Sequence, residues 1–328
     1  MTKSSNDLSL ESIEVDIQHA GERLDKVLSA YFPDLSRSRL QAWIKNGQVQ
    51  VDEDVIIKPK HKMLGGESLL IETTLEDQGE WEANDIALNV HYEDESLIII
   101  NKPAGLVVHP APGHYTDTLV NGLLFRYPEL RKLPRAGIVH RLDRDTTGLL
   151  VVARTAEAHN HLVDQLQRRS FNREYLALAH GVLVSGDTIN LPIGRHSIHR
   201  KKMAVVEAGK EAITHYRVVE KFADFTLVRV KLETGRTHQI RVHFSHLKHP
   251  LVGDPLYCIR NLRPKGASES FTQTYDSFRR QALHARLLGL LHPETGEYIE
   301  WSCDIPEDFL QLLGAIREHD NSNKSSQV

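Results

Sequence analysis

The first apolar residues at helical spacing lie in residues 21–32. Leu24, Val27 and Leu28 fall on one face of a helix, and the pattern ends at Pro33, which cannot continue it. We therefore predict a short amphipathic helix whose apolar face packs against a small core.

A second helical pattern runs through SRSRLQAWIKNG, residues 36–47. Leu40, Trp43 and Ile44 share one face, and Ser36 is placed to cap the first turn. The Asn-Gly pair at the other end favours a stop. The face opposite the apolar residues carries the cations Arg37, Arg39 and Lys45. This helix is therefore predicted to be basic on its solvent side.

Short segments of alternating polarity follow these helices. VQVDEDVII alternates about an acidic turn and GGESLLIET supplies a further strand, which predicts a compact unit over residues 15–76. The acidic stretch after it has no apolar periodicity and is predicted to be a linker, residues 77–86.

The following residues are predicted to form a larger domain, 87–318. A strand ends at Ile100 and leads into a proline-rich loop of the kind that often frames a site. Helical patterns follow in DTLVNGLLFRY and in TAEAHNHLVDQLQRRS, where Thr155 can cap the first turn.

The second half of this domain is mostly strand-like. Alternating segments joined by Gly or charged turns run from Arg173 to Trp301 and include HQIRVHF, so that Arg241 is expected on a strand. This pattern predicts an α+β fold with a mixed, mainly antiparallel sheet. The polar residues 319–328 are predicted to be a disordered tail.

Composition narrows the class of protein. The 328 residues are 40% hydrophobic and 26% charged, which is typical of a globular protein. A formal net charge of −4 gives no overall attraction to nucleic acid, so any such binding must rest on local clusters. Cys258 and Cys303 are too few for a disulfide framework, and no apolar run resembles a signal peptide or a membrane span. We expect a cytoplasmic protein.

Candidate chemistry centres on VHRLDRDTTG, residues 139–148. The apolar run LLVVA is typical of a buried strand, which places Asp143 in the turn that leads into the core. Arg141 and Arg144 flank this carboxylate and would favour the ionised, oriented form that a nucleophile or base requires. The spacing also allows a structural role, in which Asp143 or Asp145 closes the turn or pairs with an arginine.

Two other functions of these motifs are not favoured. A protein-kinase catalytic loop is excluded because Leu142 interrupts the His-Arg-Asp order, the downstream Asn is missing and no Gly-rich phosphate loop precedes it. The histidines that could suggest a metal site are His238, His243, His246 and His249. Their spacing matches no known zinc motif and no cysteine pair supports them, so we expect no metal.

Four motifs, in order along the chain, resemble those of the RluA family of RNA pseudouridine synthases. HRLDRDTTGLLVVART is similar to the family's central signature, with Thr147 where serine is common. INKPAGLVVHP resembles an upstream motif, REYLAL a tyrosine-bearing motif, and LETGRTHQIRVHFSHLKHPLVGDPLY the long carboxy-terminal motif. The amino-terminal unit resembles an S-four-like (alpha-L) RNA-binding domain. The resemblance covers residues 17–315.

The resemblance implies that Asp143 is the essential carboxylate of an isomerase that converts uridine to pseudouridine without metal or cofactor. Attack on C1′, attack on C6 of the base and removal of a sugar proton stay open as its first step. By the same resemblance, Arg141 enters the RNA stack where the target uridine has flipped out, and Tyr175 stacks on the uracil. Arg241 corresponds to the arginine that pairs with the catalytic carboxylate.

The resemblance also implies an RNA partner. PRAGIVHRLDRDTTGL, RPKGASESF and RRQALHA most resemble family members that act on large-subunit ribosomal RNA. We therefore expect this RNA, in its intersubunit stem-loop, or the assembling subunit, as the partner of a monomeric enzyme that supports ribosome assembly. The candidate phosphate contacts are Arg37, Arg39, Lys45, Arg200, Lys201 and Lys202. Another RNA target, a non-catalytic RNA-binding protein and a base-releasing hydrolase stay open as alternatives.

Overall fold

The computed structural model describes residues 8–32, 37–74, 81–110, 113–199, 201–258, 262–264 and 266–325. The chain divides into two compact units, Met1–Gly79 and Glu80–Val328, which are described separately below.

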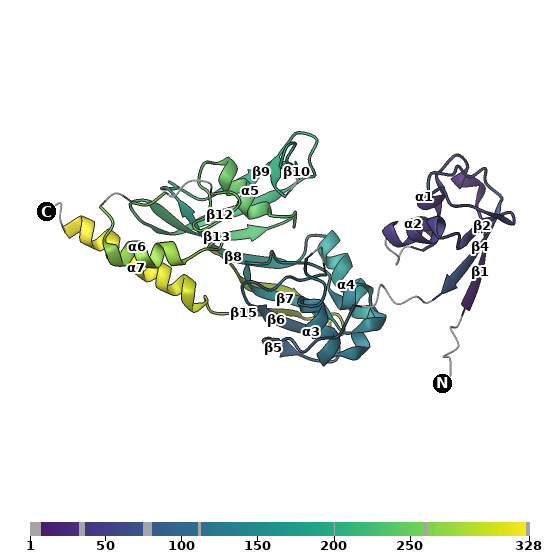
Figure 1. Cartoon of the computed structure of the whole chain (residues 1–328), viewed down its shortest axis with the longest axis horizontal. Helices are drawn as coiled ribbons and strands as arrows, with labels where there is room; N and C mark the ends of the chain where they lie inside the picture. The colour runs from purple at the N-terminus through teal and green to yellow at the C-terminus, as the bar shows by residue number, and fades with distance from the viewer. Residues whose placement is uncertain are drawn as a thin grey trace. The chain divides into compact units, whose positions relative to one another are not determined.

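The first unit is a small sheet with two short helices (Figure 1). The strands β1 (Leu8–Glu14), β4 (Ser68–Thr74), β2 (Val49–Val51) and β3 (Asp54–Val55) pair antiparallel in that order. A 3-10 turn, η1 (Ile17–His19), precedes helices α1 (Leu24–Tyr31) and α2 (Arg37–Lys45).

The apolar faces predicted for the two helices form this unit's core. Leu24, Leu28, Leu40 and Ile44 are all fully buried in one cluster with residues of the sheet. Periodicity therefore identified the helices from the same side chains that hold them against the sheet. Ser36, the expected cap of α2, lies outside the described residues.

The second unit is built on a nine-stranded sheet in the order β5-β6-β7-β14-β8-β13-β12-β9, with β15 paired to β14. Only β7 and β14 pair in parallel among the strand pairs of this sheet within the described residues. The strands are β5 (Val90–Glu93), β6 (Leu97–Lys102), β7 (Thr147–Ala153), β8 (Asn172–His180), β9 (Asp187–Asn190), β12 (Ile213–Lys221), β13 (Phe225–Leu232), β14 (Leu283–Leu291) and β15 (Tyr298–Ser302). The predicted α+β class with a mixed, mainly antiparallel sheet is confirmed.

Helices and a short ribbon surround this sheet. The helices are α3 (Leu119–Arg126), η2 (Pro128–Lys132), η3 (Pro134–Gly137), α4 (Ala156–Gln167), α5 (Gln239–His246), α6 (Glu269–Ser277) and α7 (Glu307–Ser325). The ribbon pairs β10 (Ile193–Arg195) with β11 (Met203–Val205). Thr155 caps α4 by accepting a hydrogen bond from the Ala158 amide at 3.1 Å, as its sequence predicted.

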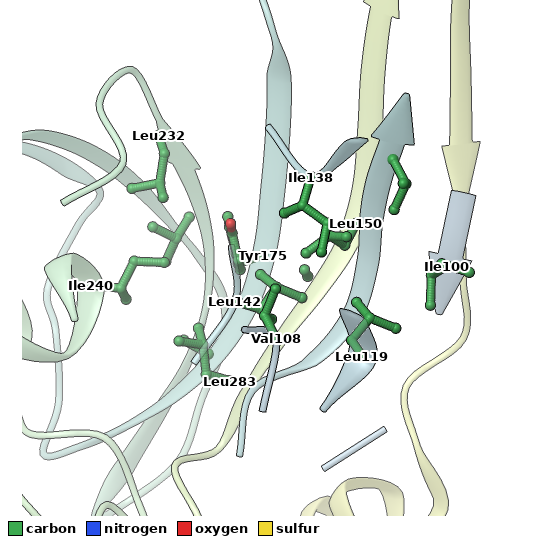
Figure 2. Close-up of a cluster of buried hydrophobic side chains, with 14 of the residues drawn as sticks. Ile100, Val108, Leu119, Ile138, Leu142, Leu150, Tyr175, Leu232, Ile240 and Leu283 are labelled. Carbon is green, nitrogen blue, oxygen red and sulfur yellow. The ribbon is translucent and has the colours of Figure 1, made fainter. Parts of the chain in front are cut away.

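The largest core cluster includes residues from β6 and β7 and from β8, β12 and β13, and so it connects both sides of the sheet about β14. Figure 2 shows Tyr175 of β8 among Leu142, Leu232 and Ile240, with Leu150 of β7 near by. Leu142 directly precedes Asp143, so burial of this leucine fixes the position of the following carboxylate.

Two predictions about local structure were wrong. The segment containing Arg241 is the helix α5, not a strand. Polar Gln239, Arg241 and His243 alternate with apolar residues as in a strand, but all of Gln239–Phe244 is buried, so this alternation does not mark an exposed face. The helix begins after His238, which has left-handed backbone dihedrals (φ 57°).

The second wrong prediction concerns residues 319–325, which continue α7 instead of being disordered. Asp320 is buried and accepts a hydrogen bond from the Ala223 amide at 2.7 Å. This contact with the turn between β12 and β13 stabilises a segment whose composition alone favours disorder (Figure 1).

The predicted boundaries of the first unit and linker also differ from the structural units. The strand β1 begins before residue 15 and pairs along its whole length with β4. In the predicted linker 77–86, the Asn84 side chain donates a hydrogen bond to the carbonyl of Thr116 at 2.9 Å.

Candidate active site

Asp143 lies in the loop that leads into β7. The backbone amide of Thr146 donates a hydrogen bond to the Asp143 carbonyl at 3.1 Å, which closes the turn, and all seven residues of β7 are buried. The carboxylate therefore stands at the start of a rigid central strand, and its side chain keeps 18% of its surface exposed.

Gly148, the last residue of the signature, is required by the packing of β7 on β14. Its φ is +110°, and a Cβ atom built there would lie 2.2 Å from the carbonyl oxygen of Ala285. Only glycine permits this close approach of the two backbones.

Arg241 connects Asp143 to a second carboxylate. Its Nη1 donates to Asp143 Oδ2 at 2.9 Å, while Nε and Nη2 donate to the two oxygens of Asp254 at 2.7 and 2.9 Å. Arg241 is 5% exposed and Asp254 is buried. Burial opposes the charge of Arg241, but the hydrogen bonds and charges of the two carboxylates raise its pKa. The guanidinium thus acts as a fixed positive group that orients Asp143.

His238 and Tyr257 complete the surroundings of this pair. His238 Nε2 lies 3.8 Å from Asp143 Oδ1, and its Nδ1 is 2.8 Å from the Tyr257 hydroxyl. The Tyr257 ring lies over the guanidinium of Arg241, 5.1 Å from it. Burial lowers the pKa of His238, which favours the neutral ring at neutral pH.

Tyr175 reaches the same site from β8. It is 7% exposed, and burial together with the Asp143 charge raises its pKa, so the phenol stays protonated at neutral pH although Arg173 acts in the opposite sense. Asp143, Tyr175 and Arg241 line one cavity of about 820 Å³ with the exposed Arg141. The structure thus brings together the four residues that the motifs marked for the site.

This cavity is strongly basic. Its lining includes Arg135, Arg141, Arg169, Arg173, Arg236 and Arg241. Apolar side chains such as Ile138 and Leu232 and the aromatic Tyr175 lie among these cations. A mixture of guanidinium groups and flat apolar surface suits a nucleotide, which presents phosphates and a base.

Those of the other predicted RNA contacts that the structure describes differ in exposure and pairing. Lys45 and Lys201 are exposed and Lys202 is half-buried. Arg37 donates hydrogen bonds to the buried Asp25, so it has at least a structural role in its own unit. Arg200 and the side chain of Arg39 lie outside the described residues.

Lys102 supports the loop that carries Asp143 and was not singled out from the sequence. It is completely buried, and its Nζ donates to the carbonyls of Pro103, Leu106 and Arg144 at 2.8, 2.9 and 2.8 Å. It therefore ties the proline-rich loop to the residue after Asp143. Burial lowers its pKa to about 7. A lysine directly after the apolar run of β6 was the available signal.

Residues 280–281 and the start of β14 hold the loop from the other side. Gln281 donates from Nε2 to the Thr146 hydroxyl at 2.9 Å, and His284 Nδ1 lies 2.9 Å from that of Thr147. Arg280 donates from Nη1 to the Asp145 carbonyl at 3.4 Å and also binds the Asp308 carboxylate. These contacts connect RRQALHA, far along the chain, to the loop that carries Asp143.

The four histidines considered as metal ligands are dispersed. His243 is 2.9 Å from the Thr214 hydroxyl, and His249 is 2.7 Å from the carbonyl of His180, which the protonated ring nitrogen donates to. Within the described residues no three His, Cys, Asp or Glu side chains are grouped as metal ligands would be. No helix in this part of the chain has the length and apolar character needed to cross a membrane.

Comparison with known proteins assigns the family. A family model described as RNA pseudouridylate synthase matches residues 96–246, and an S4 domain model matches residues 22–69. Ribosomal large subunit pseudouridine synthase D of Pseudomonas aeruginosa is 54% identical over 313 residues, which cover 95% of this chain and 98% of that protein. The chain belongs to the RNA pseudouridine synthase family.

Other members agree with this assignment. The protein of the same name from Escherichia coli is 52% identical over 297 residues, covering 90% of this chain and 91% of its own. The solved structure of human RNA Pseudouridylate Synthase Domain Containing 4 has a TM-score of 0.55 at 26% identity and covers 70% of this chain and 93% of its own. The family predicted from the four motifs is confirmed, as is the S4-like domain before it.

Proposed function

We propose that this member of the family converts specific uridines of large-subunit ribosomal RNA to pseudouridine, with Asp143 as the essential carboxylate. The observation that carries this proposal is the Asp143–Arg241 pair at 2.9 Å in a basic cavity that Tyr175 also lines. The relatives named for the large ribosomal subunit support the choice of RNA. Such an enzyme would act in the cytoplasm, on the intersubunit stem-loop.

The residues divide the work of the reaction. Arg241 makes two hydrogen bonds to Asp254, which balances most of its positive charge. Its single hydrogen bond to Asp143 orients that carboxylate. Tyr175, protonated and buried, offers a flat face to uracil and a hydroxyl near the carboxylate. Arg141 is exposed at the cavity and is free to replace a flipped base in the RNA stack.

The isomerisation needs no outside reactant. The bond from C1′ to N1 breaks and a bond from C1′ to C5 forms, while the proton on C5 leaves to solvent and N1 gains one. No cofactor is required, because one bond between the sugar and the base replaces another and nothing is oxidised or reduced overall. One oriented carboxylate suffices for covalent or base catalysis of this exchange.

The test is tritium release from large-subunit RNA labelled at C5 of uridine, followed by primer-extension mapping of the modified sites. We expect release by the wild type and a loss of at least about a thousandfold in Asp143→Asn, because that variant keeps the shape but loses the nucleophile or base. Equal release by both proteins would remove Asp143 from the mechanism.

Three other results would identify the alternatives. Free uracil among the products would identify a hydrolase, because the sugar would have been captured by water. Binding of RNA without release of tritium, on naked RNA and on precursor particles alike, would identify a non-catalytic RNA-binding protein. Modified sites in another RNA would confirm the isomerase activity but show that the substrate is not large-subunit ribosomal RNA.

A further inference from the structure

Arg173 is a buried cation in the wall of the cavity. It lies on β8, two residues before Tyr175, and both side chains line the cavity with Asp143. Arg173 is 7% exposed. Its Nη2 donates to the carbonyl of Glu233 at 3.1 Å, whereas its Nε, in the structure as described, has no hydrogen-bond partner. A guanidinium buried to this degree normally uses all its donors.

The charge of Arg173 is also uncompensated. None of the ion pairs found among the described residues involves it, and the neighbouring acids face other cations. Glu174 points to the opposite side of the strand and contacts Arg286 and Arg229, while Glu233 contacts Arg169 and His215. Arg241, equally buried, contacts two carboxylates. Burial of a cation without an acid partner is costly unless a ligand supplies the opposite charge.

The guanidinium of Arg173 lies beside the loop residue Gly235 in the wall of the cavity. Gly235 lines the same cavity, and a Cβ atom at this position would lie 2.9 Å from Arg173 Nη1. Since Gly235 does not have a positive φ, the absence of a side chain here serves space and not backbone conformation.

We propose, on the basis of the proposed function, that Arg173 binds a backbone phosphate of the RNA beside the uridine that occupies the cavity. An anion is required by the uncompensated charge, and a phosphodiester is the anion that the RNA carries at every nucleotide. Side chains two residues apart on a strand are separated by about 6.6 Å on one face. In a nucleotide, the ribose separates the base from the phosphate by a similar distance. A uracil stacked on Tyr175 would therefore bring its phosphate near Arg173. Arg173 is thus a binding residue of the site.

The experiment measures RNA affinity at several salt concentrations. Full-length Asp143→Asn protein serves as the parent, so that the large-subunit RNA fragment is not converted during the measurement. Arg173→Gln and Arg173→Lys are introduced into it. The control is Arg168→Gln, which removes an exposed arginine that pairs with Asp164 outside the cavity. Thermal unfolding without RNA is measured for each protein.

We expect Arg173→Gln to weaken binding about tenfold to a hundredfold at low salt and to reduce the slope of log affinity against log salt by about one. Arg173→Lys should recover part of the affinity because it restores the charge but not the planar fork. The melting temperature of Arg173→Gln should equal or exceed that of the parent, because an unpaired buried charge is removed. Arg168→Gln should match the parent.

Unchanged affinity and salt slope in folded Arg173→Gln would refute the proposal. Weaker binding with an unchanged slope would also refute it, because the lost contact would then be to a neutral group such as a uracil carbonyl. A clear drop in melting temperature with normal affinity would identify a structural arginine. Failure of the proposed function is a separate result, absence of tritium release by the wild type, and leaves the salt slopes interpretable.

Discussion

The buried charged residues around the cavity differ in how their charge is balanced. Arg241 has two carboxylate partners, Arg173 has none within the described residues, and Lys102 has three carbonyls. The sequence marked Arg241 through its motif but not Asp254, which lies 13 residues further along, nor the role of Lys102. Such partners could not be predicted because pairing depends on side-chain positions that local patterns do not encode.

Lys102 predicts a pH dependence of stability. Its pKa is about 7 in the folded protein, lowered by burial from 10.5. Above pH 7 the folded side chain loses its proton while the unfolded one keeps it, so the cost of burial falls as pH rises. Compared with Lys102→Met, the wild type should gain up to about 1.4 kcal/mol of unfolding free energy per pH unit between about pH 7 and pH 10.

Urea unfolding of both proteins across this range measures the difference, and effects of other titrating groups cancel between them. A difference that stays constant with pH would mean that the three carbonyls keep the buried amine charged.

At the scale of elements, the short helices of the first unit and the buried strand β7 followed directly from apolar spacing. The helix α5 did not, because its polar and apolar residues alternate with the period of a strand although both kinds are buried. Asp143 and Arg241 are 98 residues apart, so the sequence alone could suggest their pairing only through the resemblance to a family. The parallel pairing of β7 with β14 likewise has no local signal.

Because β7 and β14 are in close contact at Gly148, adding one methyl group at this residue should strongly lower the stability of the protein. Gly148→Ala should lower the unfolding free energy by more than about 3 kcal/mol, since its Cβ would overlap the Ala285 carbonyl and its φ is +110°. Gly314→Ala is the matched control. Gly314 lies in helix α7 with no atom within 4 Å of an added Cβ, so this change should stabilise by about 0.5–1 kcal/mol.

Chemical denaturation of both variants checks this prediction. A loss smaller than about 1 kcal/mol in Gly148→Ala would show that the two strands can separate locally without affecting the rest of the sheet.

At the scale of the whole molecule, the two units have separate cores. The first unit has its own buried cluster, and the cavity is lined entirely by residues between Trp81 and Leu283. Because the net charge is only −4 and the cavity is rich in arginine, attraction to RNA is concentrated locally.

Deletion of residues 1–79 should therefore leave the turnover number within about threefold of the full chain while raising KM for RNA about tenfold or more, because one binding module is lost. Tritium release against RNA concentration separates the two constants. Loss of turnover in a truncated protein that still unfolds cooperatively would instead mean that the first unit takes part in the chemistry.

The position of β14 in the sheet also has a consequence during synthesis. It lies between β7 and β8 and contacts the start of β7 through His284 and Thr147, which are 137 residues apart. A ribosome therefore produces both flanking strands well before the strand that joins them. Until then, the nascent chain holds two partial sheets with open inner edges, the kind of surface that chaperones protect from aggregation. The enzyme's active site can therefore form only after β14 has been translated.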